Sequence, residues 1–195
     1  LRKQSEDWPP GLRYEIGGSD EASKQGNQSI MDKLPIAGFL ILMLLVGQFN
    51  GLRKPAIILT TIPLAMIGVI LGLLLARSYM GFMTLLGIIS LAGIVINNGI
   101  VLLDRIRIEL EDNGRSPQDA IVTAAQLRIR PILLTTCTTI GGMIPLWLGG
   151  GPMWEPMAIA IIFGLLFSTV LTLGFIPVCY ALFFRVRFGA YTPRP

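Results

Sequence analysis

Residues 81–103 read GFMTLLGIISLAGIVINNGIVLL, and this stretch decides the fold. It contains no Asp, Glu, Lys or Arg, and it exceeds the ~20 residues that a helix needs to cross the hydrocarbon core of a bilayer. Its apolar residues follow one another without alternating with polar ones, which favours a helix over a strand of a membrane barrel. The stretch therefore predicts a transmembrane helix.

Four similar segments surround it, and the five predicted spans are residues 34–50, 55–76, 81–103, 131–149 and 157–184. The whole chain is 52% hydrophobic and 14% charged, and its mean hydropathy of +0.65 lies far outside the range of soluble domains. We therefore expect an all-α membrane protein whose transmembrane domain covers residues 34–187.

The polar segments are expected outside the membrane. Residues 1–33 precede the first span and do not resemble a cleavable signal peptide. Within them, residues 11–18 alternate like a strand, so we expect the chain to begin inside an extramembrane domain and to be a fragment. Residues 104–130 are expected to form a loop with a short interfacial helix that ends near Arg128, and residues 188–195 a tail.

The positions of lysine and arginine predict the orientation, because basic residues are retained on the cytoplasmic side. Ten of them fall on one side of the predicted spans: Arg53, Lys54, Arg105, Arg107, Arg115, Arg128, Arg130, Arg185, Arg187 and Arg194. The opposite loops contain only Arg77, apart from the basic residues of segment 1–33. This predicts an outside, periplasmic segment 1–33 and a cytoplasmic C-terminus.

Several chemistries are excluded by composition. The chain has no histidine, so it lacks a His-based triad or metal site. Cys137 and Cys179 both fall in apolar spans, where they are expected to pack as small apolar residues. No phosphate-binding glycine loop occurs, and the net charge of +4 reflects the membrane asymmetry rather than a nucleic-acid surface. We expect no enzyme activity and no cofactor.

Polar side chains inside a span are costly, so they mark helix contacts or a transport path. Ser90, Asn97 and Asp104 are seven residues apart and share nearly one helical face, with Asn98 about 100° round the helix. The asparagines either bond to neighbouring helices or take part in a relay. Asp104 either forms an interfacial ion pair with Arg105 and Arg107 or belongs to that relay.

Hydroxyl groups are unusually dense in the fourth span, at Thr135, Thr136, Thr138 and Thr139. Thr135, Thr138 and Thr139 either face the asparagines or bond backward to carbonyls of their own helix. Close helix packing is expected at four small residues: Gly68, Gly72, Gly93 and Gly99.

Motifs in this order resemble the resistance-nodulation-division (RND) transporters, especially the acriflavine-resistance-type multidrug efflux permeases. The motifs are Leu91 to Asp104, Trp8 to Leu12 followed by Gly17-Gly18, Gln48-Phe49 before Pro55, Ile62-Pro63-Leu64 with Gly68, and Arg128 to Thr136 through Gly141 and Pro145. The likeness covers residues 8–187. Each motif alone is weak, whereas their joint order is specific.

The resemblance implies a proton-driven antiporter of the bacterial inner membrane that exports drugs or other amphiphilic compounds. It implies a homotrimer that works with a periplasmic adaptor, an outer-membrane channel and membrane lipids. This chain would supply helices eight to twelve of twelve, with segment 1–33 as the end of the periplasmic porter region. The N-terminal half, with the proton-carrying carboxylates, would be missing.

The resemblance also assigns roles to single residues. Asn97 stands where well-studied members have a lysine that pairs with those carboxylates, and Asn98 matches the asparagine that follows it. Thr135 and Arg128 match relay-associated positions of the eleventh helix. Because an amide does not titrate near neutrality, Asn97 is expected to act as a hydrogen-bond partner and not as a charge switch.

Other functions remain open at this point. A lipid exporter or a protein-export accessory would belong to the same superfamily, and a non-transporting structural or assembly fragment would fit the truncated start. An intramembrane hydrolase would need a Ser-Lys pair or paired aspartates, but Asp104 only borders its span and no other acid or lysine lies well inside one.

Overall fold

The computed structural model describes residues 19–186, which fold into six α-helices without any strand. The helices are α1 (Ser19–Phe49), α2 (Arg53–Leu59), α3 (Thr61–Leu75), α4 (Phe82–Glu111), α5 (Pro117–Gly149) and α6 (Gly151–Phe183). With α2 and α3 counted as one span, five segments are long and apolar enough to cross a membrane. The predicted all-α fold with five spans is confirmed, whereas the strand-like stretch 11–18 and the tail 188–195 lie outside the described residues.

The second span is broken between α2 and α3, at Thr60. Pro63 has no N–H to donate to the carbonyl four residues earlier, so the helical ladder is interrupted here. The hydroxyl of Thr60 donates to the carbonyl of Ile57 at 2.6 Å, and that of Thr61 donates to the carbonyl of Ile58 at 2.5 Å. These side-chain bonds supply donors inside an apolar segment where the proline removes one.

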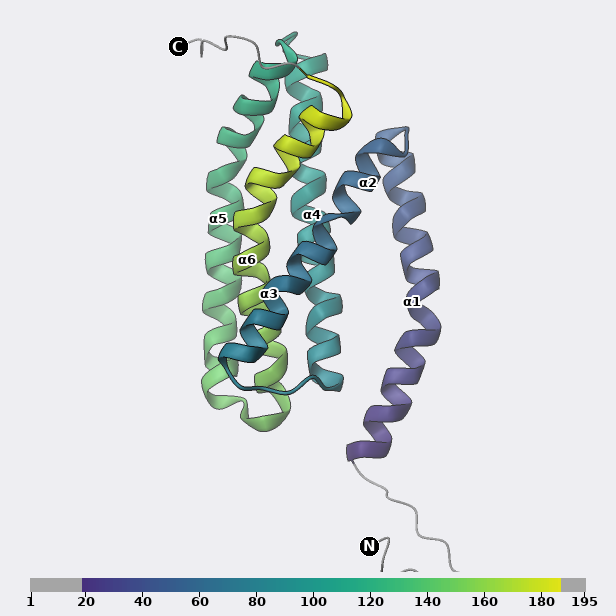
Figure 1. Cartoon of the computed structure of the whole chain (residues 1–195), viewed down its shortest axis with the longest axis vertical. Coiled ribbons are helices and arrows are strands. Elements are labelled where there is room, and N and C mark those ends of the chain that lie inside the picture. The colour runs from purple at the N-terminus through teal and green to yellow at the C-terminus, as the bar shows by residue number, and fades with distance from the viewer. Residues whose placement is uncertain (1–18, 187–195) are drawn as a thin grey trace, which may run out of the picture.

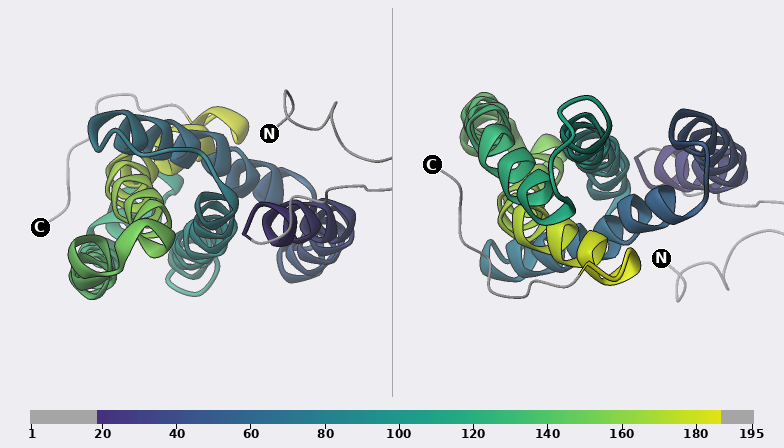
Figure 2. Two further views of the ribbon diagram at one scale, coloured as in Figure 1. Left: turned by 90° about the horizontal axis from the view of Figure 1, so that it is seen from below. Right: turned by 90° about the horizontal axis from the view of Figure 1, so that it is seen from above.

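The bundle is built around α6. Figures 1 and 2 show α3 on one side of α6 and α4 and α5 on the other. Within the most apolar 18-residue stretch of each helix, 56% of α6 is buried, compared with 6% of α1. Since α6 is apolar on all sides, it takes the central position that such a helix requires.

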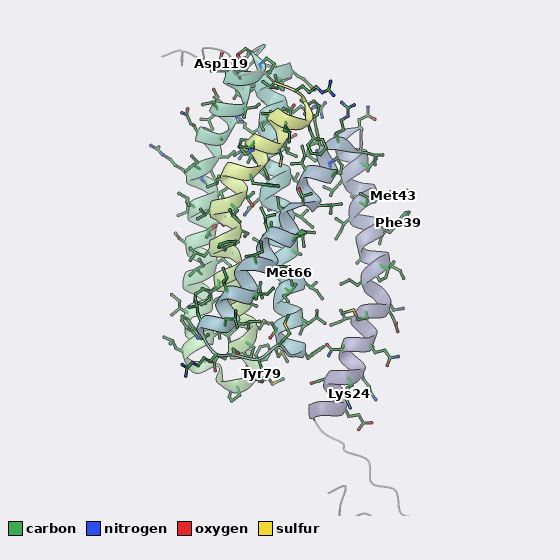
Figure 3. All side chains as sticks on the ribbon, in the orientation of Figure 1. Lys24, Phe39, Met43, Met66, Tyr79 and Asp119 are labelled. Carbon is green, nitrogen blue, oxygen red and sulfur yellow. The ribbon has the colours of Figure 1, made fainter. Side chains whose placement is uncertain are left out.

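By contrast, α1 stands beside the bundle (Figure 1). Leu45 and Phe49 are buried in the core near α2, but most apolar side chains of α1 are exposed. Phe39 and Met43 are each 64% exposed and point away from the other helices (Figure 3). In a membrane, such a surface is covered by lipid or by another part of the protein.

Glycines allow α3 to lie directly against α6. A Cβ atom at Gly68 would be 2.5 Å from the Cβ of Phe167 and 2.9 Å from the carbonyl oxygen of Phe163. A Cβ at Gly72 would collide with the side chain of Phe163. Two helix backbones can approach this closely only where the residues at the contact have no side chain, as at Gly68 and Gly72.

The other two glycines that were expected to pack lie in different surroundings. A Cβ at Gly99 would be 3.4 Å from Ile58, which is an ordinary van der Waals contact. A Cβ at Gly93 would have no neighbour within 4 Å, because this part of α4 faces outward. Of the four glycines predicted to pack closely, Gly68 and Gly72 therefore do so, and the α4 pair does not.

The helix ends differ from the predicted ones. In the expected loop 104–130 only residues 112–116 lie outside α4 and α5, and the helix that was expected to end near Arg128 continues through Pro131. The last helix begins at Gly151 instead of residue 157, and the first begins at Ser19 instead of residue 34. Hydropathy shows where a helix leaves lipid, whereas backbone and ion-pair bonds prolong the helix beyond that point.

Glu109 fastens the polar end of α4 to the turn before α5. Its side chain is buried, and its carboxylate accepts from Arg105 Nη2 at 2.6 Å, Arg115 Nε at 3.0 Å and Asn113 Nδ2 at 2.9 Å. The backbone N–H of Arg115 also donates to the carbonyl of Glu109 at 3.1 Å. A buried carboxylate with three donors fixes the turn because removing it would leave the donors unsatisfied.

We predict that Glu109→Gln destabilises the protein by about 2 kcal/mol, less than a fully buried pair would lose because Arg115 is half-exposed. Denaturant unfolding in detergent measures the change. Glu111→Gln is the matched control, since Glu111 pairs at 2.8 Å with Arg107 on the exposed side of the same helix. Equal unfolding of the two variants would contradict the anchoring role of Glu109.

Candidate functional site

The candidate site begins at the middle of α4, where two amides lie inside the apolar span. Asn97 is exposed and Asn98 is partly exposed. Within residues 19–186 neither amide forms a side-chain hydrogen bond. Because lipid offers no partner for an amide, these groups require partners that the described part of the chain does not supply.

On α5, two of the predicted threonines bond to carbonyls of their own helix. The hydroxyl of Thr135 donates backward to the carbonyls of Pro131 at 3.1 Å and Ile132 at 2.9 Å, and Thr138 bonds backward in the same way. Backward bonding uses the hydroxyl proton but leaves an acceptor lone pair on Thr135, which is exposed. Of the two arrangements left open by the sequence, Thr135 and Thr138 adopt the backward one, whereas Thr139 forms no side-chain hydrogen bond within residues 19–186.

Asp104 and Arg128 lie nearer the end of the bundle that contains the α4–α5 turn. An ion pair of Asp104 with Arg105 and Arg107 was one of the two alternatives left open by the sequence. It is not formed, because these arginines pair with Glu109 and Glu111 one turn further on. Asp104 interacts with Arg107 only through its electrostatic field. An ion pair with these arginines therefore does not explain why an aspartate lies at position 104.

Arg128 of α5 is half-buried, and its Nε atom is buried without a hydrogen-bond partner. A guanidinium N–H that is removed from water in this way costs free energy unless an acceptor is brought to it. Like the two asparagines, Arg128 has a hydrogen-bonding group without a partner in the described part of the chain.

We group six polar residues of these two neighbouring helices under the name α4–α5 polar face: Ser90, Asn97, Asn98 and Asp104 on α4, with Thr135 and Arg128 on α5. The two helices pack against each other and lie on the same side of α6 (Figure 2). The structure brings the predicted site residues onto neighbouring helices, yet no bond links α4 residues of this face to α5 residues. Such a face can exchange hydrogen bonds with a carboxylate presented from outside.

Three buried hydroxyls of α6 were missed by the sequence interpretation. Thr169 shares a 2.9 Å hydrogen bond with Thr136 of α5, Ser168 donates to its own helix, and Thr172 is buried without a partner. Only the unusual presence of hydroxyls in an otherwise apolar helix could have indicated them. Among the described residues, no group of three or more acidic, Cys or His side chains could hold a metal ion.

Comparison with known proteins identifies the family and the fold of the chain. The model of the AcrB/AcrD/AcrF family matches residues 2–184. One similar solved structure is described as a heavy metal efflux pump, crystal form II, with 29% identity and a TM-score of 0.76 over 94% of this chain. Crystal form I of a heavy metal efflux pump is 28% identical with a TM-score of 0.72 over 93% of this chain.

In both cases the chain spans 19% of the length of the protein that it matches. The matched part includes all five apolar spans and the whole α4–α5 polar face, and the family model covers more than half of the sequence. The chain belongs to the AcrB/AcrD/AcrF family of RND transporters.

Proposed function

We propose that this chain is the part of a proton-driven efflux permease that supplies hydrogen-bond partners to the proton-carrying site. The observation that carries the proposal is the α4–α5 polar face, with exposed Asn97 at the centre of an apolar helix and no partner within residues 19–186. Transport needs no covalent chemistry from these residues.

An amide suits this role because it both donates and accepts. It can donate to an ionised carboxylate and accept from a protonated one, so its bond reverses direction when the carboxylate takes up a proton. No carboxylate occurs in the middle of the described spans, and Asp104 lies two turns from Asn97. The proton carrier is therefore proposed to lie in the remainder of the permease.

The membrane orientation is proposed from charge. The α1–α2 turn, the α4–α5 turn and the end of α6 all lie at one end of the bundle (Figure 1). Eight basic residues lie toward that end, namely Arg53, Lys54, Arg105, Arg107, Arg115, Arg128, Arg130 and Arg185. Toward the other end lie Arg77 of the α3–α4 turn and, within segment 1–33, Lys24 and Lys33 of α1. The positive-inside rule then supports a cytoplasmic C-terminus in a bacterial inner membrane, with segment 1–33 in the periplasm.

Substrate and assembly are proposals of the same kind. The resemblance to multidrug permeases supports amphiphilic drugs, whereas the similar solved structures are heavy metal efflux pumps and support metal ions as the second candidate. A homotrimer with a periplasmic adaptor and an outer-membrane channel is proposed from family membership. The described residues give no direct metal-binding group in support of the second candidate.

A transport assay tests the function and separates the two substrates. The complete permease is placed in proteoliposomes and a pH gradient is imposed. Movement of an amphiphilic dye or of a heavy-metal cation is measured, and a pH-sensitive fluorophore follows the protons. We expect counter-movement of protons with one substrate, abolished by a protonophore. Substrate movement that persists unchanged after the gradient is collapsed would refute proton coupling.

A further inference from the structure

The end of α6 has an arginine in a position where glycine is usual. The N–H of Arg185 donates to the carbonyl of Leu182 at 3.2 Å, and the N–H of Val186 donates to the carbonyl of Ala181 at 2.9 Å. This pair of bonds is the Schellman motif, whose left-handed residue is most often glycine. Arg185 adopts this conformation with φ of 50°, which is strained for a residue with a Cβ atom.

The same arrangement occurs at the opposite end of the bundle. Arg77 has φ of 51° after α3, its N–H donates to Leu74 at 3.3 Å, and the N–H of Ser78 donates to Leu73 at 3.0 Å. Both arginines are exposed, and neither forms an ion pair within residues 19–186. Each therefore carries a strained backbone and an uncompensated charge at an edge of the apolar region.

Beside Arg185 the surface at the end of α6 has a shallow and largely open depression. An open groove of about 450 Å³ is lined by Val178, Ala181, Leu182, Arg185 and Val186. Its wall is almost entirely aliphatic, and Val178 and Leu182 are 66% and 74% exposed. The groove thus offers apolar contact along the membrane-spanning helix and one guanidinium at its rim.

We propose that this groove binds one membrane phospholipid. The guanidinium of Arg185 contacts the phosphate, and an acyl chain lies along Val178 and Leu182. A guanidinium matches phosphate oxygens through two parallel N–H bonds, and the aliphatic part of the arginine side chain extends over apolar surface while its charge reaches the headgroup. A bound phosphate gives the strained arginine a function that glycine at this position would lack.

A purely local explanation is that the positive charge complements the C-terminal dipole of α6. Lysine would satisfy that dipole as well as arginine does, but it contacts a phosphate as a point charge and loses the two-bond fork. The two explanations therefore differ in what Arg185→Lys does to lipid binding.

The test titrates phosphatidylglycerol into the protein, purified from membranes in its native assembly, and counts bound lipid by native mass spectrometry. We expect Arg185→Gly to bind about tenfold more weakly, the loss of one charge-assisted contact, and Arg185→Lys to fall between the two. Arg53→Gln, which removes an exposed charge at the same end, should bind normally. Inorganic phosphate and a neutral diacylglycerol should both bind more weakly than the phospholipid.

Thermal unfolding gives a second readout that does not depend on counting lipid. Without lipid, Arg185→Gly should be at least as heat-stable as the unaltered protein, because glycine adopts the left-handed conformation without strain. Added phosphatidylglycerol should then raise the melting temperature of the unaltered protein more than that of the variant. Equal lipid binding by Arg185→Gly, or equal binding of diacylglycerol and phosphatidylglycerol, would overturn the proposal.

Discussion

Replacing Gly68 with leucine should prevent α3 from packing on α6 and remove most of the folded protein. The new Cβ would lie 2.5 Å from the Cβ of Phe167 and 2.9 Å from the backbone oxygen of Phe163. A backbone atom cannot rotate away as a side chain can, so the helices must separate. Overpacking of this severity costs about 3 kcal/mol or more, a large part of the stability of a typical domain.

The measurement is the yield of monodisperse protein in detergent together with its denaturant midpoint. Gly174→Leu is the matched control, because Gly174 lies on α6 with no heavy atom within 4 Å of its Cβ position. That variant should remain folded. Normal yield and stability of Gly68→Leu would show that α3 and α6 are not in the contact described.

Replacing Asn97 with leucine should slow proton-coupled transport strongly without unfolding the protein. Leucine removes both the donor and the acceptor of the amide, and a hydrogen bond to a charged group contributes about 1.5–3 kcal/mol. This corresponds to a loss of about tenfold to a hundredfold in the proton-coupled rate. Folding should be unaffected because Asn97 is exposed and bonds to nothing within residues 19–186.

Efflux by the complete permease, normalised to its amount in the membrane, measures this effect. Asn97→Gln keeps the amide on a longer side chain, so it should retain more activity than Asn97→Leu. If Asn97→Leu exported substrate at the unaltered rate, the amide would have no part in proton coupling.

Much of the fold was predictable because lipid imposes a simple rule on sequence. A continuous apolar run such as residues 81–103 has to be a helix, since lipid leaves its backbone no other bonding partner. Hydropathy could not place the ends of α4 and α5. The bonds that extend these helices, such as Arg105 with Glu109, depend on side-chain geometry outside the apolar run.

The site was predictable only in part. Spacing placed Asn97 and Asp104 on one helical face, and the exposure of Asn97 agrees with a partner outside the described chain. Which partner Arg107 selects was not predictable, because Asp104 lies three residues before it and Glu111 four residues after it, and both spacings allow a pair on a helix. The hydrogen bond between Thr136 and Thr169 depends on how α5 rotates against α6, which no local pattern encodes.

The central claim is that the α4–α5 polar face meets the proton-carrying site of the assembled permease, which protons reach through water, rather than lipid. Cysteine labelling tests it directly, because a thiol reacts with a maleimide as the thiolate, which forms in water and not in hydrocarbon. In a permease without Cys137 and Cys179, Asn97→Cys is compared with Met43→Cys on the exposed apolar side of α1. We predict rapid labelling by a water-soluble maleimide at position 97 and almost none at position 43. Equally slow labelling at both positions would contradict the account.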